Sequence, residues 1–395
     1  MRRRLVLLVL AARVLATAAL LVGPWTDDAA ELAGWDASRF QAIHDAPGRP
    51  WIDHGVEYPP GSVALIELIT VQVGESVFGE GVVGTQRLLV ALSLVVDLGV
   101  AVVLERHRRD AGLAYLVLGT AVVPAGLLRF DLWAAACTAI GLIFLAQQNR
   151  KGRAHVMAVG GFALAVVAGA AIKISPGLLI AVALAVRKKT EAVVALVCGA
   201  FVAAGWLVWA GTDALTQVTS LRGAEGWHVE SVPGSLLVLT GAGPARFEAD
   251  AYRIGTLDDD LVLAGRVMTL LIVVGLGVLV HRRSRTPGMA ASAAPLAMLG
   301  STAALVLTAP LLSPQFLLWL TPAAALTWVG GHRRPTVFTA AAIALTALTL
   351  ALFGPPGVDH PLAAAMLLVR DTLLIGIIGT CALDLRSSQP GCRAR

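Results

Sequence analysis

The chain has 395 residues, of which 57% are hydrophobic and only 14% are charged, and its mean hydropathy is +0.76. These values exclude an ordinary soluble globular domain and indicate a single integral membrane domain. The net charge of +5 does not point to a nucleic-acid partner, because the basic residues stand in small clusters between apolar runs. Such clusters are typical of cytoplasmic loops.

Apolar runs of roughly 17 to 22 residues recur along the chain, which is enough to cross about 30 Å of hydrocarbon. They predict an all-α polytopic membrane protein with about twelve transmembrane helices and both termini in the cytoplasm. The first run follows Arg2, Arg3 and Arg4 like a signal peptide, but without a convincing cleavage site, so we expect it to be a span. The expected spans are 5–22, 88–104, 113–128, 132–146, 156–172, 176–186, 192–210, 261–280, 289–312, 315–329, 336–353 and 362–383.

The segment 61–73 decides this topology. It is apolar, but it is short for a span and follows Pro59 and Pro60. If it stays outside as an interfacial helix, most lysines and arginines fall in cytoplasmic segments; if it crosses the membrane, nearly all of those clusters move outside. The positive-inside rule therefore favours an interfacial helix.

The prediction leaves one membrane domain over residues 1–395, with two large extracytoplasmic loops at 24–87 and 211–260 and a cytoplasmic tail at 385–395. Charges within or near the spans, such as Arg13, Asp97, Arg266 and Arg370, form no obvious relay in the sequence. The reactive residues are therefore expected in the outer loops.

The first loop carries many carboxylates among aromatic residues. A partly desolvated carboxylate at a membrane interface can act as a general base toward a hydroxyl, and Asp36 and Asp53 are the candidates. Glu57-Tyr58-Pro59-Pro60-Gly61 is either part of a binding site or a structural turn that starts the interfacial helix.

Cations at the outer ends of spans form a second group. Arg129 and Asp131 flank the start of a span, and Lys173 lies between two short ones. Ionisable groups at this depth are functional candidates, although Arg129 and Asp131 could simply pair with each other or extend to lipid phosphates. Lys173 at an interrupted pair of helices is suited to an anion such as phosphate.

The second loop combines Arg222, Trp227, His228 and Glu230 within a short stretch. Aromatic faces and hydrogen-bonding groups suit a sugar, and arginine suits a phosphate, so the combination suits a glycosyl phosphate. An amphipathic interfacial helix with Trp227 in the aromatic belt is an equal alternative. The histidines match no zinc spacing, and no metal site is predicted.

Taken together, these motifs resemble those of glycosyltransferase family 87, polytopic enzymes of the GT-C class that use polyprenyl-phosphate sugars. The resemblance extends from about residue 24 to residue 319, and it departs from the family at Phe40, where Tyr is frequent, and at Trp227-His228, where Leu-Gln is usual. The matching motifs are Asp36 with Phe40, Pro50-Trp51-Ile52-Asp53, Glu57-Tyr58-Pro59-Pro60-Gly61, Arg129-Phe130-Asp131-Leu132, Lys173-Ile174-Ser175-Pro176, Arg222 to Glu230-Ser231-Val232, and Ser313-Pro314-Gln315-Phe316-Leu317-Leu318-Trp319.

The resemblance implies a GT-C-like bundle in the plasma membrane and an inverting transfer of a sugar, mannose or arabinose, to a cell-envelope glycan or glycolipid hydroxyl. No cofactor beyond the polyprenyl-phosphate sugar is implied, and nothing points to a particular oligomeric state. Asp36 or Asp53 is then the base, and Arg129, Lys173 and Arg222 hold the donor phosphate. The expected substrate contacts are Glu57, Tyr58, Asp131, Trp227, His228, Glu230, Gln315 and Trp319.

Two other classes fit the same sequence. A polyprenyl-linked sugar transporter or flippase would share the spans and the anion site, but transport predicts functional charges near the membrane midplane. A non-catalytic envelope-assembly subunit would share the topology. The concentration of polar groups in the outer loops favours an enzyme.

Overall fold

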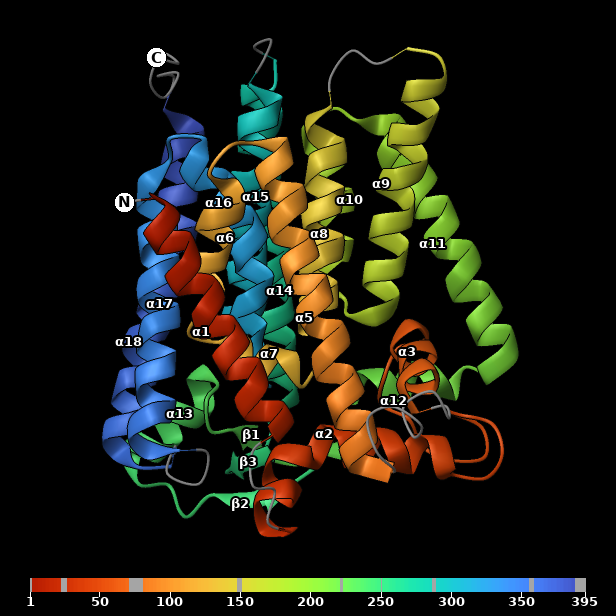
Figure 1. Cartoon of the computed structure of the whole chain (residues 1–395), viewed down its shortest axis with the longest axis vertical. Helices are drawn as coiled ribbons and strands as arrows, with labels where there is room; N and C mark the ends of the chain where they lie inside the picture. Colours follow the sequence, from red (N-terminus) through yellow and green to blue (C-terminus); the bar gives the residue numbers. More distant parts are fainter. Residues whose placement is uncertain are drawn as a thin grey trace.

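The computed structural model describes residues 2–22, 27–70, 81–147, 151–220, 223–249, 251–285, 289–354 and 359–387. Figure 1 shows an elongated bundle of helices that run mostly along its long axis. The chain is an all-α polytopic membrane protein in its main architecture, as predicted.

Seven of the described helices are long and apolar enough to cross a membrane. Each of them contains one of the expected spans and begins up to seven residues before it or ends up to three residues after it. They are α1 (Arg2–Val22), α5 (Gly81–His107), α9 (Arg153–Ile172), α11 (Lys189–Ala210), α14 (Asp259–Arg283), α17 (Arg333–Phe353) and α18 (Pro361–Arg386).

The other five expected spans fall on shorter or interrupted helices. The segment 113–128 is broken after α6 (Ala111–Gly119), and Pro124 then starts the short helix α7 (Val123–Leu127). Prolines also lie in the 3₁₀ turns that precede α10 and α16. The remaining elements are α8 (Asp131–Ala146), η1 (Ser175–Gly177), α10 (Leu178–Ala185), α15 (Ala290–Leu307), η3 (Pro314–Leu320) and α16 (Thr321–Val329).

The two loops contain helices, as expected, and a small sheet that the sequence pattern did not predict. Strands β1 (Trp227–His228), β2 (Arg246–Glu248) and β3 (Ala251–Ile254) form an antiparallel sheet in the order β1-β3-β2. The helices of the loops are α2 (Asp27–Asp45), α3 (Pro60–Thr70), α12 (Asp213–Thr219) and α13 (Val232–Thr240).

Helix α3 accounts for the described part of the ambiguous segment 61–73, whose last residues lie outside the described ranges. Its start is fixed to the end of α9, where the Ser62 hydroxyl donates to the Ile172 carbonyl over 2.7 Å. A Cβ on Gly61 would lie 2.8 Å from the Ala171 backbone, so glycine permits this close approach. Figure 1 shows α3 beside the end of the bundle that carries α2 and α12.

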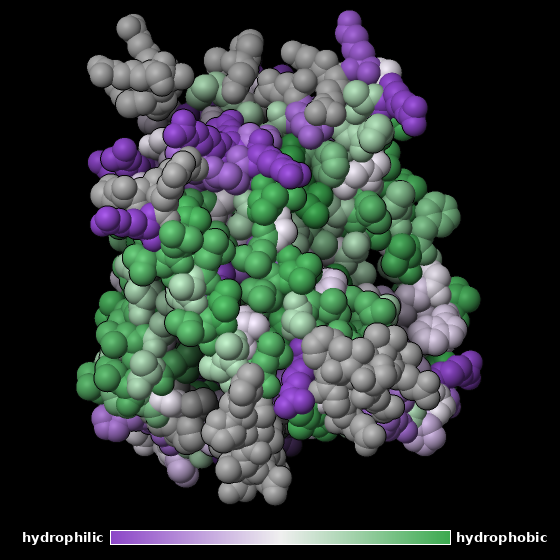
Figure 2. Space-filling view, in the orientation of Figure 1, coloured by the Kyte–Doolittle hydropathy of each residue, from purple (hydrophilic) through white to green (hydrophobic). Residues whose placement is uncertain are grey.

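The first helix begins and the last helix ends at the same end of the bundle, whereas α2, α13 and the sheet lie at the opposite end (Figure 1). On the face shown in Figure 2, a broad apolar band separates polar side chains at the two ends. This division is expected of a protein that spans a bilayer.

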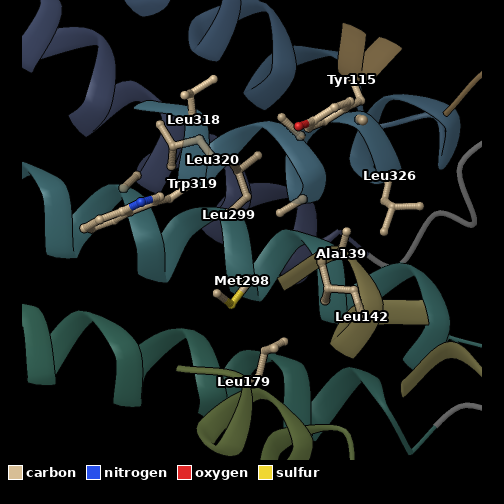
Figure 3. Packing of buried hydrophobic residues seen from close by; sticks show 14 of the residues in the cluster. Tyr115, Ala139, Leu142, Leu179, Met298, Leu299, Leu318, Trp319, Leu320 and Leu326 are labelled. Carbon is tan, nitrogen blue, oxygen red and sulfur yellow. The ribbon is translucent and has the colours of Figure 1, made fainter. Parts of the chain in front are cut away.

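The apolar core lies where the shorter helices cross, among residues of α8, α10, α15 and η3 (Figure 3). Leu142, Leu179, Met298, Leu299 and Leu318 are all within 2% of complete burial. A Cβ on Gly126 would lie 2.2 Å from Leu318 Cδ1, so glycine lets η3 pack directly on α7. The turn that follows α7 and the turn that precedes η3 are thereby held close to each other.

A buried polar network joins α1 to α5 and α6. Arg13 Nε donates to Asp97 over 2.6 Å, and Arg13 Nη1 donates to the Leu116 carbonyl over 2.7 Å and to Thr120 over 2.9 Å. The Tyr115 hydroxyl donates to the second Asp97 oxygen over 2.7 Å. Arg13 and Asp97, 84 residues apart in the sequence, therefore meet inside the bundle.

Candidate functional site

The central contact of the site is an ion pair between Asp36 on α2 and Arg129, which lies in the turn between α7 and α8. The turn forms because α7 ends after one short stretch, and the Arg129 amide donates to the Gly126 carbonyl over 3.2 Å. The side chains of Asp36 and Arg129 are 15% and 33% exposed, so the pair is neither fully buried nor freely solvated. Arg129 therefore pairs with Asp36, whereas neither carboxylate oxygen of Asp131 has a hydrogen-bond partner among the described residues.

Aromatic packing fixes α2 against this turn. Phe40, one helical turn after Asp36, stacks on Phe130 at a ring-centroid distance of 4.9 Å. Tyr58 packs on Phe40 edge to face at 5.5 Å. Phe40 and Phe130 are each 1% exposed and Tyr58 is 5% exposed. These contacts hold Asp36 opposite Arg129 and place Tyr58 against the Phe40 ring, one helical turn from Asp36.

The segment 227–231 of the second loop lies at the end of the bundle that carries α2 (Figure 1). The Val229 amide donates to the Tyr252 carbonyl over 3.0 Å, which attaches the segment to β3. Ser231 caps α13, because its hydroxyl accepts from the Gly234 amide over 3.2 Å. The chain here forms a short strand and a capped helix start, and not the amphipathic helix that was the alternative expectation.

His228 is buried and uncharged. Burial, followed by the charges of Arg253, Arg370 and Arg129, lowers its pKa to about 3, although a hydrogen bond with the Leu312 backbone acts in the opposite direction. Its Nδ1 accepts from the Glu230 amide over 3.3 Å. At neutral pH this imidazole can accept or donate hydrogen bonds but adds no positive charge.

Glu230 is a buried carboxyl group beside a buried arginine. Burial raises its pKa to about 7, the positive charges of Arg370 and Arg129 oppose this rise, and the charge of Asp371 adds to it. Arg370 Nη1 lies 3.6 Å from Glu230 Oε2. Since Arg129 acts on both His228 and Glu230, the Asp36–Arg129 pair and the segment 227–231 belong to one electrostatic site.

Asp53 and Glu57 form contacts of a different kind. Asp53 lies in an exposed turn, where its carboxylate accepts from the Arg49 amide over 2.6 Å. Both Glu57 oxygens accept from Arg39 on α2, over 3.1 and 2.7 Å. The observed contacts of Asp53 lie within its own loop, and those of Glu57 join that loop to α2.

Lys173 ends α9 and lies against the aromatic side chains of η3. Its Nζ is 5.9 Å from the centroid of the Phe316 ring, which stacks on Trp319 at 4.5 Å. Gln315 and Trp319 are 3% and 6% exposed. The structure therefore brings Lys173 to η3.

Asp131, the first residue of α8, is fully buried, and neither of its carboxylate oxygens has a hydrogen-bond partner among the described residues. Ser175 Oγ in η1 and Trp319 Nε1 in η3 are also buried without a described partner. Trp227 is 5% exposed in β1. Arg222 lies outside the described residues.

Asp371 and Arg253 are site residues that the sequence analysis did not name, and Arg370 was named only as a charge within a span. Each is at most 4% exposed. Arg370 and Asp371 are adjacent charges within an apolar helix. Such charges are costly unless they have partners, so their positions in the sequence already indicate functional candidates. In the described residues, no group of three or more His, Cys, Asp or Glu side chains is arranged to hold a metal ion.

Comparison with known proteins gives limited help. No protein-family model and no curated protein matches the chain, so the resemblance to glycosyltransferase family 87 has no independent support. Two solved structures of ArnT from Cupriavidus metallidurans align with 96% of this chain and 76% of theirs. The apo structure gives a TM-score of 0.44 at 16% identity, and the structure bound to undecaprenyl phosphate gives 0.38 at 18%. At these values the likeness does not identify an activity for this chain.

Proposed function

We propose that the chain is a membrane glycosyltransferase of the GT-C class that transfers a sugar from a polyprenyl-phosphate donor to a hydroxyl group. The observation that carries the proposal is the Asp36–Arg129 pair, a carboxylate and a guanidinium held together at one end of an apolar bundle. A lipid-linked sugar phosphate needs these three features together: an apolar environment for its tail, a cation for its phosphate and a base for the acceptor.

Asp36 is the proposed base. It takes the proton of the acceptor hydroxyl while the acceptor oxygen forms a bond to the anomeric carbon of the donor. The bond between that carbon and the phosphate oxygen breaks, and its electron pair leaves with the phosphate. Attack and departure on opposite faces invert the anomeric centre.

Arg129, Lys173 and Arg222 are the proposed phosphate ligands. Each carries a positive charge that stabilises the negative charge that grows on the leaving phosphate. Because Arg129 already pairs with Asp36, a phosphate on the same guanidinium competes with that carboxylate. Phosphate binding would then weaken the hold of Arg129 on Asp36 and make Asp36 more available as a base.

Asp53 is the weaker candidate for the base. It is 47% exposed and holds its own turn, whereas Asp36 is partly desolvated beside a proposed phosphate ligand. A base next to the leaving group can lie near the anomeric carbon at the same time. We therefore assign Asp36 and keep Asp53 as a comparison.

The sugar and the acceptor would be held by polar and aromatic groups around the pair. Glu230 and His228 present a carboxyl group and a neutral imidazole, which suit hydroxyl groups. The lipid tail would lie near η3. The full set of proposed substrate contacts is Glu57, Tyr58, Asp131, Trp227, His228, Glu230, Gln315 and Trp319.

The proposed donor sugar is mannose or arabinose, and the acceptor is a glycan or glycolipid of the cell envelope. The site would face the extracytoplasmic side of the plasma membrane, since the basic clusters belong to the opposite end under the positive-inside rule. Accessibility of single cysteines introduced at exposed Ser38 and at Ser387 to a membrane-impermeant reagent tests this orientation: Ser38 should react from outside in intact cells, and Ser387 only after lysis.

A polyprenyl-linked sugar transporter is the second candidate, and the Arg13–Asp97–Tyr115 network is the observation that favours it. Buried charges within a bundle are frequent in transport pathways. Here both Asp97 oxygens already accept hydrogen bonds, one from Arg13 and one from Tyr115. A network in which both carboxylate oxygens are occupied holds helices together, which is why we prefer the enzyme.

The purified protein in liposomes separates the candidates. Radiolabelled polyprenyl-phosphate mannose and polyprenyl-phosphate arabinose are supplied on one face with a membrane glycolipid extract. We expect label to move from the donor to glycolipid. Donor that crosses the bilayer unchanged would replace the enzyme with the transporter, and label that neither moves nor crosses would contradict both.

A further inference from the structure

Arg370 lies on α18, a membrane-spanning helix, and yet its contacts are with the external segment 227–231. Its side chain is fully buried, and Nη2 donates to the backbone carbonyl of Glu230, a residue 140 positions earlier in the chain. Nη1 lies 3.6 Å from the carboxylate of the same residue. One guanidinium thus holds both the backbone and the side chain of Glu230.

Asp371 orients this guanidinium. Its Oδ1 accepts from Arg370 Nε over 2.9 Å and lies 2.8 Å from Nη2. The planar guanidinium is therefore fixed on one edge by its neighbour in sequence and faces Glu230 with the other edge. Truncation of either partner would leave an uncompensated buried charge.

Three atoms of this cluster are buried and lack a hydrogen-bond partner within the part of the chain that the structure describes: Glu230 Oε2, Arg370 Nη1 and Asp371 Oδ2. The 3.6 Å separation of the first two is too long for a direct hydrogen bond. The Glu230 carboxyl group is thus attracted to Arg370 by charge, without a direct hydrogen bond to it. Its Oε2 can still accept a hydrogen bond from another donor.

The charges that act on Glu230 come from two elements, with Arg370 and Asp371 on α18 and Arg129 in the turn before α8. His228 on β1 is next to it but neutral, and α13, which follows it, has no charged side chain. Since Arg129 also pairs with Asp36, the α18 cluster and the proposed base are linked through one cation.

We propose that Arg370 and Asp371 are positioning residues, through which α18 holds Glu230 and sets the charge that it presents to the Asp36–Arg129 pair. This inference rests on the proposed function for its catalytic meaning. The contacts themselves, and the control of Glu230 by α18, do not depend on which reaction the site performs.

The two positioning residues act on Glu230 with opposite sign. Loss of the Arg370 charge removes a stabiliser of the Glu230 carboxylate and raises the pKa of Glu230. Loss of the Asp371 charge removes a repulsion and lowers that pKa. A purely structural role would make both substitutions disturb the site in the same way.

The test follows the protonated carboxyl group of Glu230 by infrared difference spectroscopy of the full-length protein in nanodiscs, across a pH titration. Glu230→Gln identifies the band by its absence. We expect a midpoint near pH 7 in the unmodified protein, in line with the pKa of about 7. The midpoint should move upward by about 1 to 3 pH units in Arg370→Met and downward in Asp371→Asn.

Arg370→Lys keeps the charge, and its midpoint should lie close to that of the unmodified protein. This variant provides a test of the charge at position 370 even if Arg370→Met does not fold. Arg266→Met is the matched control, because Arg266 is an exposed arginine on the membrane helix α14. A midpoint that moves in the same direction in Arg370→Met and Asp371→Asn, or in neither, would overturn the proposal.

The same variants report separately on catalysis. If the chain transfers sugar, the acidic limb of the kcat–pH profile should move in the same two directions as the infrared midpoint. If the unmodified protein transfers no sugar but the infrared midpoint shifts as expected, the proposed function fails while the control of Glu230 by α18 stands.

Discussion

Replacement of Asp36 by Asn gives the most informative prediction, because it should affect transfer and donor binding in opposite directions. The substitution removes the proposed base but keeps the size of the side chain. Positioned general bases contribute about 10²- to 10⁴-fold to rate, so we expect kcat to fall by that factor. The fold should persist, because Phe40 and its aromatic contacts still hold α2 in place.

Donor binding should become tighter in the same variant. Asp36 competes with phosphate for Arg129, and the pair is partly exposed, so its loss releases only about 1 kcal/mol, the upper part of the range for exposed ion pairs. That energy corresponds to about a fivefold gain in affinity. Arg129→Ala removes the cation itself and should weaken binding.

The assay is equilibrium binding of a fluorescent polyprenyl phosphate to the protein in nanodiscs, together with the radiolabel transfer assay. Asp53→Asn is the matched control, since its carboxylate serves an exposed turn, and it should change both quantities less than threefold or so. The reasoning is refuted if Asp36→Asn still transfers sugar at the original rate, or if it weakens donor binding as Arg129→Ala does.

The remaining predictions concern the bundle and the second loop. Arg13→Leu should destabilise the protein by about 3–5 kcal/mol, because Asp97 is left as an uncompensated buried charge. The double replacement Arg13→Leu with Asp97→Leu should restore part of that stability. Thermal unfolding in detergent measures both variants, and a double variant that is no more stable than Arg13→Leu argues against the pair. Gly234→Ala places a Cβ 2.0 Å from the His228 carbonyl oxygen and should displace the segment 227–231. Transfer should then fall at least tenfold or so while unfolding changes by only about 1–3 kcal/mol. Gly205→Ala meets no atom within 4 Å and should leave transfer unchanged; equal activity of the two alanine variants would show that the position of this segment does not matter.

Structural features that depend on local sequence could be predicted, and features that depend on contacts between distant residues could not. Seven spans followed from apolar length alone, because a bilayer imposes that length on any helix that crosses it. The break between α6 and α7 was not predicted, although Pro124 at the start of α7 is a signal for it in the sequence.

The site shows the same division. Asp36 and Arg129 could be proposed one by one from their positions beside apolar runs, and the structure pairs them. The contact of Arg370 with Glu230 spans 140 residues, and no local pattern encodes it. The strands β1 and β3 contain only two and four residues, too few to display an alternation of apolar and polar side chains.

The buried pair of Arg13 and Asp97 has a consequence for the way in which the chain enters the membrane during synthesis. An arginine near the centre of a lone helix disfavours insertion by about 2.5–3.5 kcal/mol. Its partner is made 84 residues later. At roughly 5–20 residues per second, the first helix waits on the order of 4–17 s for that carboxylate. During this interval the first helix carries the cost of its arginine without the carboxylate, and the arrival of α5 removes that cost.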